Sequence, residues 1–166
     1  MIRKFRENDL PSIMQIWFDS NVEVHSFIPE KYWMDNFEMV KDILPQAEIY
    51  VYENLGKISG FIGLNKDYIE GIFVEKNMRS KGIGKQLLNY VKKLKEEMHL
   101  SAYQKNYKAI SFYQREDFVI QSESIDNDTK QVKLVSVYRD TFLNVKDDTY
   151  AKINSAYAYG GPKNAI

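Results

Sequence analysis

The chain has 166 residues, 44% of them hydrophobic and 14% aromatic, which is enough for one domain with a substantial core and too short to suggest two. Its 23 basic and 23 acidic residues give a formal net charge of zero, which argues against general affinity for nucleic acid or an anionic membrane. The absence of cysteine excludes disulfides, thiolate metal sites and a cysteine nucleophile, and we expect no metal site. The first residues form no apolar export segment, and no run approaches the roughly 18 apolar residues of a membrane helix, so we expect a cytoplasmic protein.

Hydrophobic periodicity predicts helices and strands along the first 140 residues. Asn8 and Asp9 can cap the first helix, and Pro45 stops the second. Asn54-Leu55-Gly56 predicts one hairpin turn, and Asp126-Asn127-Asp128 predicts another. The expected strands cover residues 2–5, 48–53, 57–64, 68–74, 100–103, 118–124 and 132–139; the expected helices begin near residue 9, follow the turn at 25–29, and span 82–98 and 107–116.

The order of these elements predicts an α/β (α+β) fold. A helix crosses over between strands 68–74 and 100–103, so these two strands should be parallel, whereas the hairpins are antiparallel. The prediction is a mixed central sheet of about six to seven strands with about four helices, in one domain over residues 1–140. The pattern weakens after Asp140, and residues 141–166 are expected to be a C-terminal extension of unknown role.

A glycine-containing turn, Arg79-Ser80-Lys81-Gly82-Ile83-Gly84-Lys85, lies between a strand-like run and a helix-like run. A turn of this kind leaves several backbone N–H groups unpaired at the partly positive end of the helix, and its basic side chains strengthen that field. This predicts a phosphate site, although an ordinary strand-to-helix turn is the alternative. Two familiar loops are disfavoured, because Gln86 stands where a triphosphate loop has Ser or Thr, and Leu87 stands where the dinucleotide fingerprint has glycine.

Two segments together resemble the motifs of the Gcn5-related N-acetyltransferase (GNAT) family. Residues 79–84 resemble its Arg-x-x-Gly-x-Gly loop, and residues 106–118 resemble its Asn-x-x-Ala-x-x-Phe-Tyr-x-x-x-Gly-Phe segment. The second segment departs at Asp117, where glycine usually stands at a helix end that often requires positive φ, a conformation that aspartate adopts at modest cost. The resemblance covers residues 1–140. Within the family it is closest to small bacterial YiaC-like protein-lysine acetyltransferases, through residues 25–28, Tyr32-Trp33 and residues 103–106.

The resemblance implies a GNAT fold and the transfer of acetyl from acetyl-coenzyme A to a primary amine, by direct attack in a ternary complex. A main-chain N–H of the strand before the loop, aimed at the thioester oxygen, would stabilise the developing oxyanion. Asn106 is expected to bond the pantetheine arm, to cap the helix that begins at Tyr107, or to do both. The cofactor-binding residues so implied are Ile72, Phe73, Val74, Arg79, Ser80, Lys81, Gly82, Ile83, Gly84, Lys85, Asn106, Ala109 and Phe112.

Tyr113 is the residue that the resemblance places as general acid. A phenol with a pKa of about 10 keeps its proton at neutral pH and can give it to a departing thiolate. The alternative is a packed aromatic beside Phe112. Glu70 is the candidate general base, since it lies two residues from Tyr68 and therefore on the same face of the strand. The alternative is that Glu70 is a solvated surface carboxylate and that water alone acts as the base.

The acceptor side is predicted from aromatic residues. Tyr68 is expected to line the acceptor channel, and His25, Trp33 and Tyr103 are expected to shape the pocket; His25 is also a candidate base because of its pKa. The acceptor is a protein lysine, an N-terminal amine or a small-molecule amine, and the subgroup resemblance favours lysine. The alternatives from other classes are a non-catalytic acyl-CoA-binding module and an interaction protein whose C-terminal tyrosines dock a partner. We expect a monomer or a homodimer.

Overall fold

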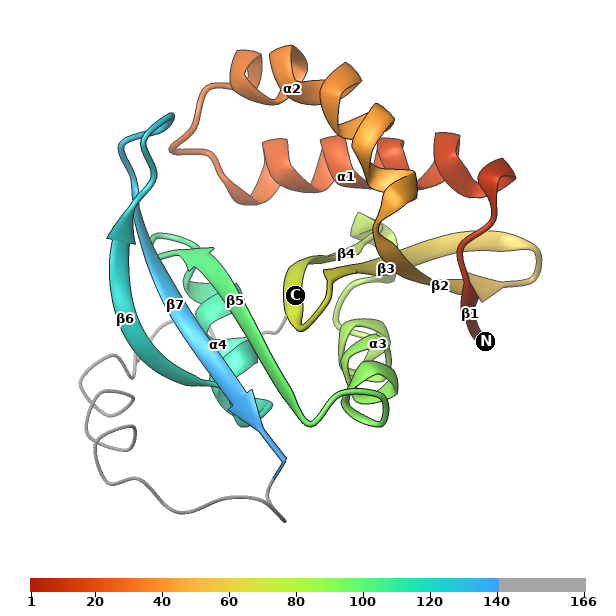
Figure 1. Cartoon of the computed structure of the whole chain (residues 1–166). Helices are drawn as coiled ribbons and strands as arrows, with labels where there is room; N and C mark the ends of the chain where they lie inside the picture. The colour runs from red at the N-terminus through yellow and green to blue at the C-terminus, as the bar shows by residue number, and fades with distance from the viewer. Residues whose placement is uncertain (141–166) are drawn as a thin grey trace.

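Residues 1–140 are described by a computed structural model, in which seven strands form one mixed sheet in the order β1-β2-β3-β4-β5-β7-β6 (Figure 1). Four α-helices cover its two faces in this part of the chain, none of them long and apolar enough to cross a bilayer. The predicted fold class is confirmed. The elements are β1 (Ile2–Lys4), α1 (Leu10–Val24), α2 (Glu30–Ile43), β2 (Glu48–Asn54), β3 (Lys57–Asn65), β4 (Tyr68–Val74), α3 (Ile83–Lys92), β5 (Glu97–Tyr103), α4 (Tyr107–Arg115), β6 (Val119–Ile125) and β7 (Val132–Arg139).

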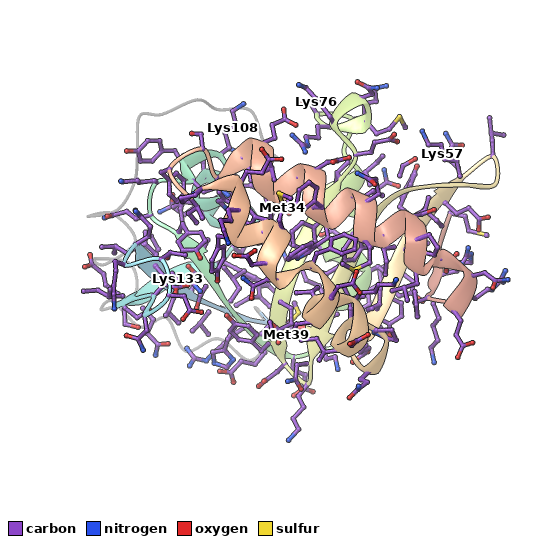
Figure 2. All side chains as sticks on the ribbon, turned by 90° about the horizontal axis from the view of Figure 1, so that it is seen from above. Met34, Met39, Lys57, Lys76, Lys108 and Lys133 are labelled. Carbon is purple, nitrogen blue, oxygen red and sulfur yellow. The ribbon has the colours of Figure 1, made fainter. Side chains whose placement is uncertain are left out.

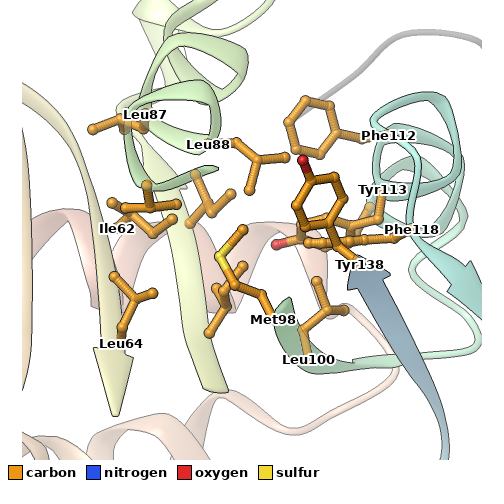
Figure 3. Packing of buried hydrophobic residues seen from close by; sticks show 14 of the residues in the cluster. Ile62, Leu64, Leu87, Leu88, Met98, Leu100, Phe112, Tyr113, Phe118 and Tyr138 are labelled. Atoms are coloured by element: carbon orange, nitrogen blue, oxygen red, sulfur yellow. The ribbon is translucent and has the colours of Figure 1, made fainter. Parts of the chain in front are cut away.

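The two faces of the sheet carry separate hydrophobic cores because successive strand residues point to opposite sides. Helices α1 and α2 cover one face, and the view onto them places Met34 and Met39 on the outer side of α2 (Figure 2). Helices α3 and α4 cover the other face, where Leu87 and Leu88 of α3 pack toward residues of β3 and β5 (Figure 3). Both cores reach the middle of the sheet, where β4 lies.

The hairpin predictions are confirmed. The β2–β3 turn is built from Leu55 and Gly56, both at positive φ (51° and 78°), which suits a tight hairpin. Asp117 adopts a φ of 69°, as expected for the residue that ends the helix in place of glycine. Asp9 differs from its prediction, because its carboxylate accepts the N–H of Arg6 and binds the guanidinium of Arg3, and it makes no capping bond to α1.

The predicted end of the third helix is wrong. Helix α3 ends at Lys92, and Met98, the last residue of the helix expected over 82–98, is instead a fully buried residue of β5. Leu94, which the expected helix also includes, lies after the end of α3 and is 51% exposed. Strand β5 begins at Glu97 because it pairs along its whole length with β7, from Glu97 opposite Arg139 to Tyr103 opposite Lys133. The local hydrophobic pattern allows Met98 to belong to either the helix or the following strand, and the long-range pairing with β7 places it in the strand.

Strands β4 and β5 run parallel, as predicted, but they separate soon after they meet. The two strands pair only at Tyr68 opposite His99 and at Ile69 opposite Leu100. Immediately afterwards the β3–β4 register shifts, so that Glu70 is an extra residue between the pairs formed by Ile69 and Gly71. The edge of β4 from Gly71 to Val74 therefore has no strand partner on the β5 side among residues 1–140, and Figure 1 shows the two strands diverging. The candidate site lies at this divergence.

Candidate active site

A cleft of about 290 Å³ lies where β4 and β5 separate, with the C-terminal half of α1 on one side and the start of α4 on the other. Its lining brings together most of the site residues predicted from the sequence, although they come from seven different elements or loops. Those of them that line the cleft are His25, Trp33, Tyr68, Glu70, Ile72, Phe73, Val74, Arg79, Tyr103, Asn106, Ala109 and Tyr113. The remaining predicted residues lie outside this lining; they are Ser80, Lys81, Gly82, Ile83, Gly84, Lys85 and Phe112. Phe112 is buried in the core.

The open edge of β4 presents backbone groups to the cleft. The N–H of Glu75 donates to the carbonyl of Ser59 in β3, so the peptide groups of Ile72 and Val74 point the other way, toward the missing partner. The carbonyl of Val74 already accepts a bond from Arg79. The N–H groups of Ile72 and Val74 and the carbonyl of Ile72 remain to pair with an extended amide-containing ligand, which is what the pantetheine arm of coenzyme A offers.

The glycine turn leaves the first amides of α3 without acceptors. Gly82, the N-cap residue, has a φ of 82° and no capping side chain, and the first helical bond runs from Gln86 N–H to the Gly82 carbonyl at 3.0 Å. Within the described residues, the N–H groups of Ile83, Gly84 and Lys85 therefore find no backbone acceptor. Unpaired amides at the positive end of a helix suit a diphosphate group.

Tyr113 lies at the inner end of the cleft and is only 6% exposed. Its ring stacks on Phe118, with centroids 5.5 Å apart, and packs beside Phe112. Burial, with a smaller contribution from the Tyr68 hydroxyl, raises the pKa of Tyr113, so the phenol holds its proton firmly. Tyr113 is therefore both a packed aromatic residue of the core and a residue of the cleft lining. Its protonated hydroxyl is available there as a hydrogen-bond donor.

His25, which follows α1, is enclosed by aromatic rings. It stacks on Trp33 at 5.4 Å and meets Tyr103 and Phe27 edge-on. Burial lowers the pKa of His25 to about 4, with the positive charge of Lys133 acting in the same direction and the backbone of Asn21 opposing it. At neutral pH the ring is uncharged, so it is a weak base there and serves as a wall of the cleft.

Asp126 of the β6–β7 turn and Lys133 of β7 also line the cleft, and neither is among the site residues predicted from the sequence. The carboxylate of Asp126 accepts bonds from the Tyr103 hydroxyl (3.0 Å) and from Lys133 (2.9 Å). Burial opposes ionisation of Asp126, but these bonds and those from the N–H groups of Asp128 and Thr129 lower its pKa to about 2. Asp126 had been predicted only as a turn residue, and its reach to Tyr103 depends on how the hairpin folds over β5, for which the sequence carries no signal.

Glu70 is the exposed carboxylate at the β4 bulge. It lines the cleft and also a second, larger hollow of about 830 Å³ between the end of α2 and the β2–β4 sheet face. Tyr68, two residues earlier, lines the cleft as well. Both side chains therefore line one cleft, although the bulge at Glu70 interrupts the strand alternation from which a common face was predicted.

A sheet split beside a bulged strand, with unpaired helix amides at the turn that follows that strand, is the arrangement expected of a transferase that uses an acyl-coenzyme A donor. A sequence profile of the acetyltransferase (GNAT) domain matches residues 45–120. The chain is 37% identical over 122 residues to the peptidyl-lysine N-acetyltransferase YiaC of Escherichia coli K12, covering 72% of this chain and 84% of that protein. This chain therefore belongs to the GNAT family of acetyltransferases, and it is an acetyl-CoA-dependent N-acetyltransferase that takes an amine acceptor.

Solved structures share the fold. The solution structure of apo YjaB from Escherichia coli has a TM-score of 0.76 and 23% identity, covering 85% of this chain and 98% of that one. A Bacillus anthracis protein of the acetyltransferase type, solved in complex with acetyl coenzyme A, has a TM-score of 0.52 and 27% identity over 56% of this chain and 62% of that one. A profile of the LytR_cpsA_psr family also matches residues 104–166, of which residues 141–166 lie outside the described part of the chain.

Proposed function

We propose that this acetyltransferase modifies the lysine side chain of a protein or peptide, and that residues 1–140 form the domain that does so. The observation that carries the proposal is the identity of 37% to a protein named as a peptidyl-lysine N-acetyltransferase, over most of both chains. The aromatic wall of His25, Trp33 and Tyr103 beside an exposed carboxylate, Glu70, is consistent with a long cationic side chain. Acetyl-coenzyme A supplies the activated acetyl group as a thioester.

The chain's own residues have distinct parts in this proposal. The amides of residues 83–85 hold the diphosphate, and the open edge of β4 pairs with the amide-containing arm. An N–H of Ile72 or Val74 donates to the thioester oxygen, where negative charge develops. Tyr113 protonates the departing sulfur, since its raised pKa keeps a proton available at neutral pH.

The acceptor must lose a proton before it attacks, because a lysine with a pKa of about 10.4 arrives as the ammonium form. Glu70 is the candidate base in the proposal, because it lies beside the β4 edge and is accessible from the cleft. Its carboxylate attracts the ammonium group and accepts its proton directly or through water. His25 is the weaker candidate, since its uncharged ring does not attract the ammonium group and its Nε2 faces the side-chain amide of Asn106.

The experiment that tests the proposal is an acceptor panel. The full chain is incubated with acetyl-CoA and lysine peptides, matched peptides whose only amine is the N-terminus, or small polyamines and aminoglycosides, while free thiol is followed. We expect thiol release with the lysine peptides and a mass increase of one acetyl group on the lysine. Release with only N-terminal or small amines would overturn the lysine assignment, and binding of coenzyme A without turnover would favour the acyl-CoA-binding alternative.

A further inference from the structure

The guanidinium of Arg79 makes contacts that a phosphate-loop motif does not explain. Its side chain is 16% exposed, and all three nitrogens face protein atoms. Nε donates to the carbonyl of Val74 at 2.9 Å, and Nη2 donates to Oγ of Ser20 at 3.2 Å. Nη1 lies 3.3 Å from a carboxylate oxygen of Glu23. One side chain therefore joins the end of β4 to helix α1.

The two ends of this connection belong to different walls of the cleft. Val74 lies on the open β4 edge, and its carbonyl would be free for a ligand if Arg79 did not occupy it. Ser20 is buried in α1, one residue before Asn21 and five before His25, which face the acceptor side of the cleft. The rigid fork of a guanidinium can satisfy three directions at once, which the single ammonium of lysine cannot do.

We infer that Arg79 is a positioning residue. Its guanidinium occupies the Val74 carbonyl on the β4 edge and holds α1 against that edge through Ser20 and Glu23. The acyl donor and the acceptor amine therefore meet at a fixed separation. The inference rests on the proposed function for the identity of the two walls. A misplacement of about 1 Å between reacting groups costs on the order of 100-fold in rate, so a connection of this kind acts mainly on turnover and on the acceptor.

The test compares Arg79→Lys, Ser20→Ala and Glu23→Gln in the full chain, with kcat, the KM of a lysine peptide and the Kd of coenzyme A measured for each. We expect Arg79→Lys to lower kcat/KM for the peptide at least about tenfold. The Kd of coenzyme A should stay within about threefold, a small fraction of its binding energy. Ser20→Ala and Glu23→Gln should each give a smaller change in the same direction. The double variant Arg79→Lys/Glu23→Gln should be no worse than Arg79→Lys, because both substitutions remove one connection.

Lys76→Gln is the matched control. Lys76 also pairs with Glu23, at 3.2 Å, and carries a positive charge close to the loop, but it does not line the cleft. Figure 2 shows Lys76 at the periphery of the molecule. We expect its constants to match those of the wild type. A tenfold rise in the Kd of coenzyme A in Arg79→Lys, with Ser20→Ala and Glu23→Gln unchanged, would overturn the inference and make Arg79 a phosphate ligand.

Amide hydrogen exchange measures whether Arg79 holds α1 in place and does not depend on catalytic turnover. A failure of this inference can therefore be told apart from a failure of the proposed function. In Arg79→Lys, the amides of residues 20–25 should exchange faster than in the wild type, whereas those of α3 after its first turn should not change. Unchanged exchange at residues 20–25 would contradict the inference even if the enzyme acetylates lysine. Faster exchange there would support the connection even if the acceptor proves to be another amine.

Discussion

The side-chain amide of Asn106 lies 3.3 Å from Nε2 of His25 and so joins the start of α4 to the end of α1 across the cleft. Oδ1 of this amide accepts the N–H of Ala109 as the helix cap, so its amino group must face His25 and Nε2 must be the acceptor. The imidazole proton is then on Nδ1, which is buried and makes no hydrogen bond of full geometry in the described part of the chain, although the backbone of Asn21 interacts with the ring. His25 is therefore held neutral in a single tautomer.

This arrangement predicts a loss of stability in mild acid. The pKa of His25 is about 4 in the folded state and 6.5 as a model value, so between these pH values the unfolded chain binds a proton that the folded chain does not. The contribution is complete above pH 6.5 and is lost as pH falls toward 4, by about 3 kcal/mol at most. Urea unfolding at pH 7 and pH 4.5 measures it. His25→Asn should lose less stability between the two, and an equal loss in both proteins would contradict the prediction.

Asn106→Asp offers a sharper version of the same prediction. Aspartate keeps the cap on Ala109 but replaces the donor facing Nε2 with a carboxylate, which favours the charged imidazolium. We expect the pKa of His25, followed by NMR of the ring protons, to rise by at least about one unit, since a nearby opposite charge has this effect. His99, the other histidine in the chain, provides an internal reference. A pKa that stays at about 4 would show that Asn106 does not govern the state of His25.

Tyr113→Phe should separate chemistry from binding. The substitution keeps the ring stacked on Phe118 but removes the hydroxyl, so kcat should fall by about 10²-fold or more while the Kd of coenzyme A stays unchanged. Tyr138→Phe is the matched control, because Tyr138 is buried to a similar degree (8% exposed) in the same core and does not line the cleft. Thiol release under saturating acceptor gives kcat for both. A Tyr113→Phe enzyme with normal kcat would eliminate the general-acid role.

Gly82→Ala tests the phosphate turn. Gly82 and Gly56 both have positive φ (82° and 78°), and a Cβ would meet only Gln86 at 3.9 Å on Gly82 and nothing within 4 Å on Gly56, so alanine at either position costs about 1–2 kcal/mol of backbone strain. Only Gly82 adjoins the unpaired amides of α3. Calorimetry should show a rise in the Kd of coenzyme A of about tenfold, or 1.4 kcal/mol, for Gly82→Ala and none for Gly56→Ala. Equal affinities in the two variants would count against the turn as a phosphate site.

Gly71→Ala and Gly63→Ala form a pair that probes the sheet beside the site. The two glycines lie opposite each other on β4 and β3. A Cβ on Gly71 would lie 2.4 Å from the ring of Phe73, whereas one on Gly63 would meet nothing nearer than Ile49 at 4.0 Å. Thermal unfolding should show a loss of about 1–3 kcal/mol for Gly71→Ala, since the ring must move off Phe61. Gly63→Ala should show no loss, and a reversed order would contradict this packing.

Features encoded by neighbouring residues were predictable from the sequence. The hairpin turn at residues 54–56, the positive φ of Asp117 and the cap formed by Asn106 each depend on a few consecutive residues, and each is present. The end of α3 was not predictable, because Glu97 joins β5 through pairing with Arg139. The partners of Arg79 were not predictable either, since Ser20 lies 59 residues earlier in the chain and meets it only after α1 packs on the sheet.

The two residue pairs between β4 and β5 also bear on how the domain unfolds. They are the whole backbone ladder between a group of four strands and a group of three, so within residues 1–140 cooperativity across that joint depends on side-chain packing, chiefly that of Ile69, Met98 and Leu100. A donor molecule lying in the joint adds its binding free energy to the folded state through mass action. The melting temperature of this enzyme should therefore rise with the concentration of its own acyl donor.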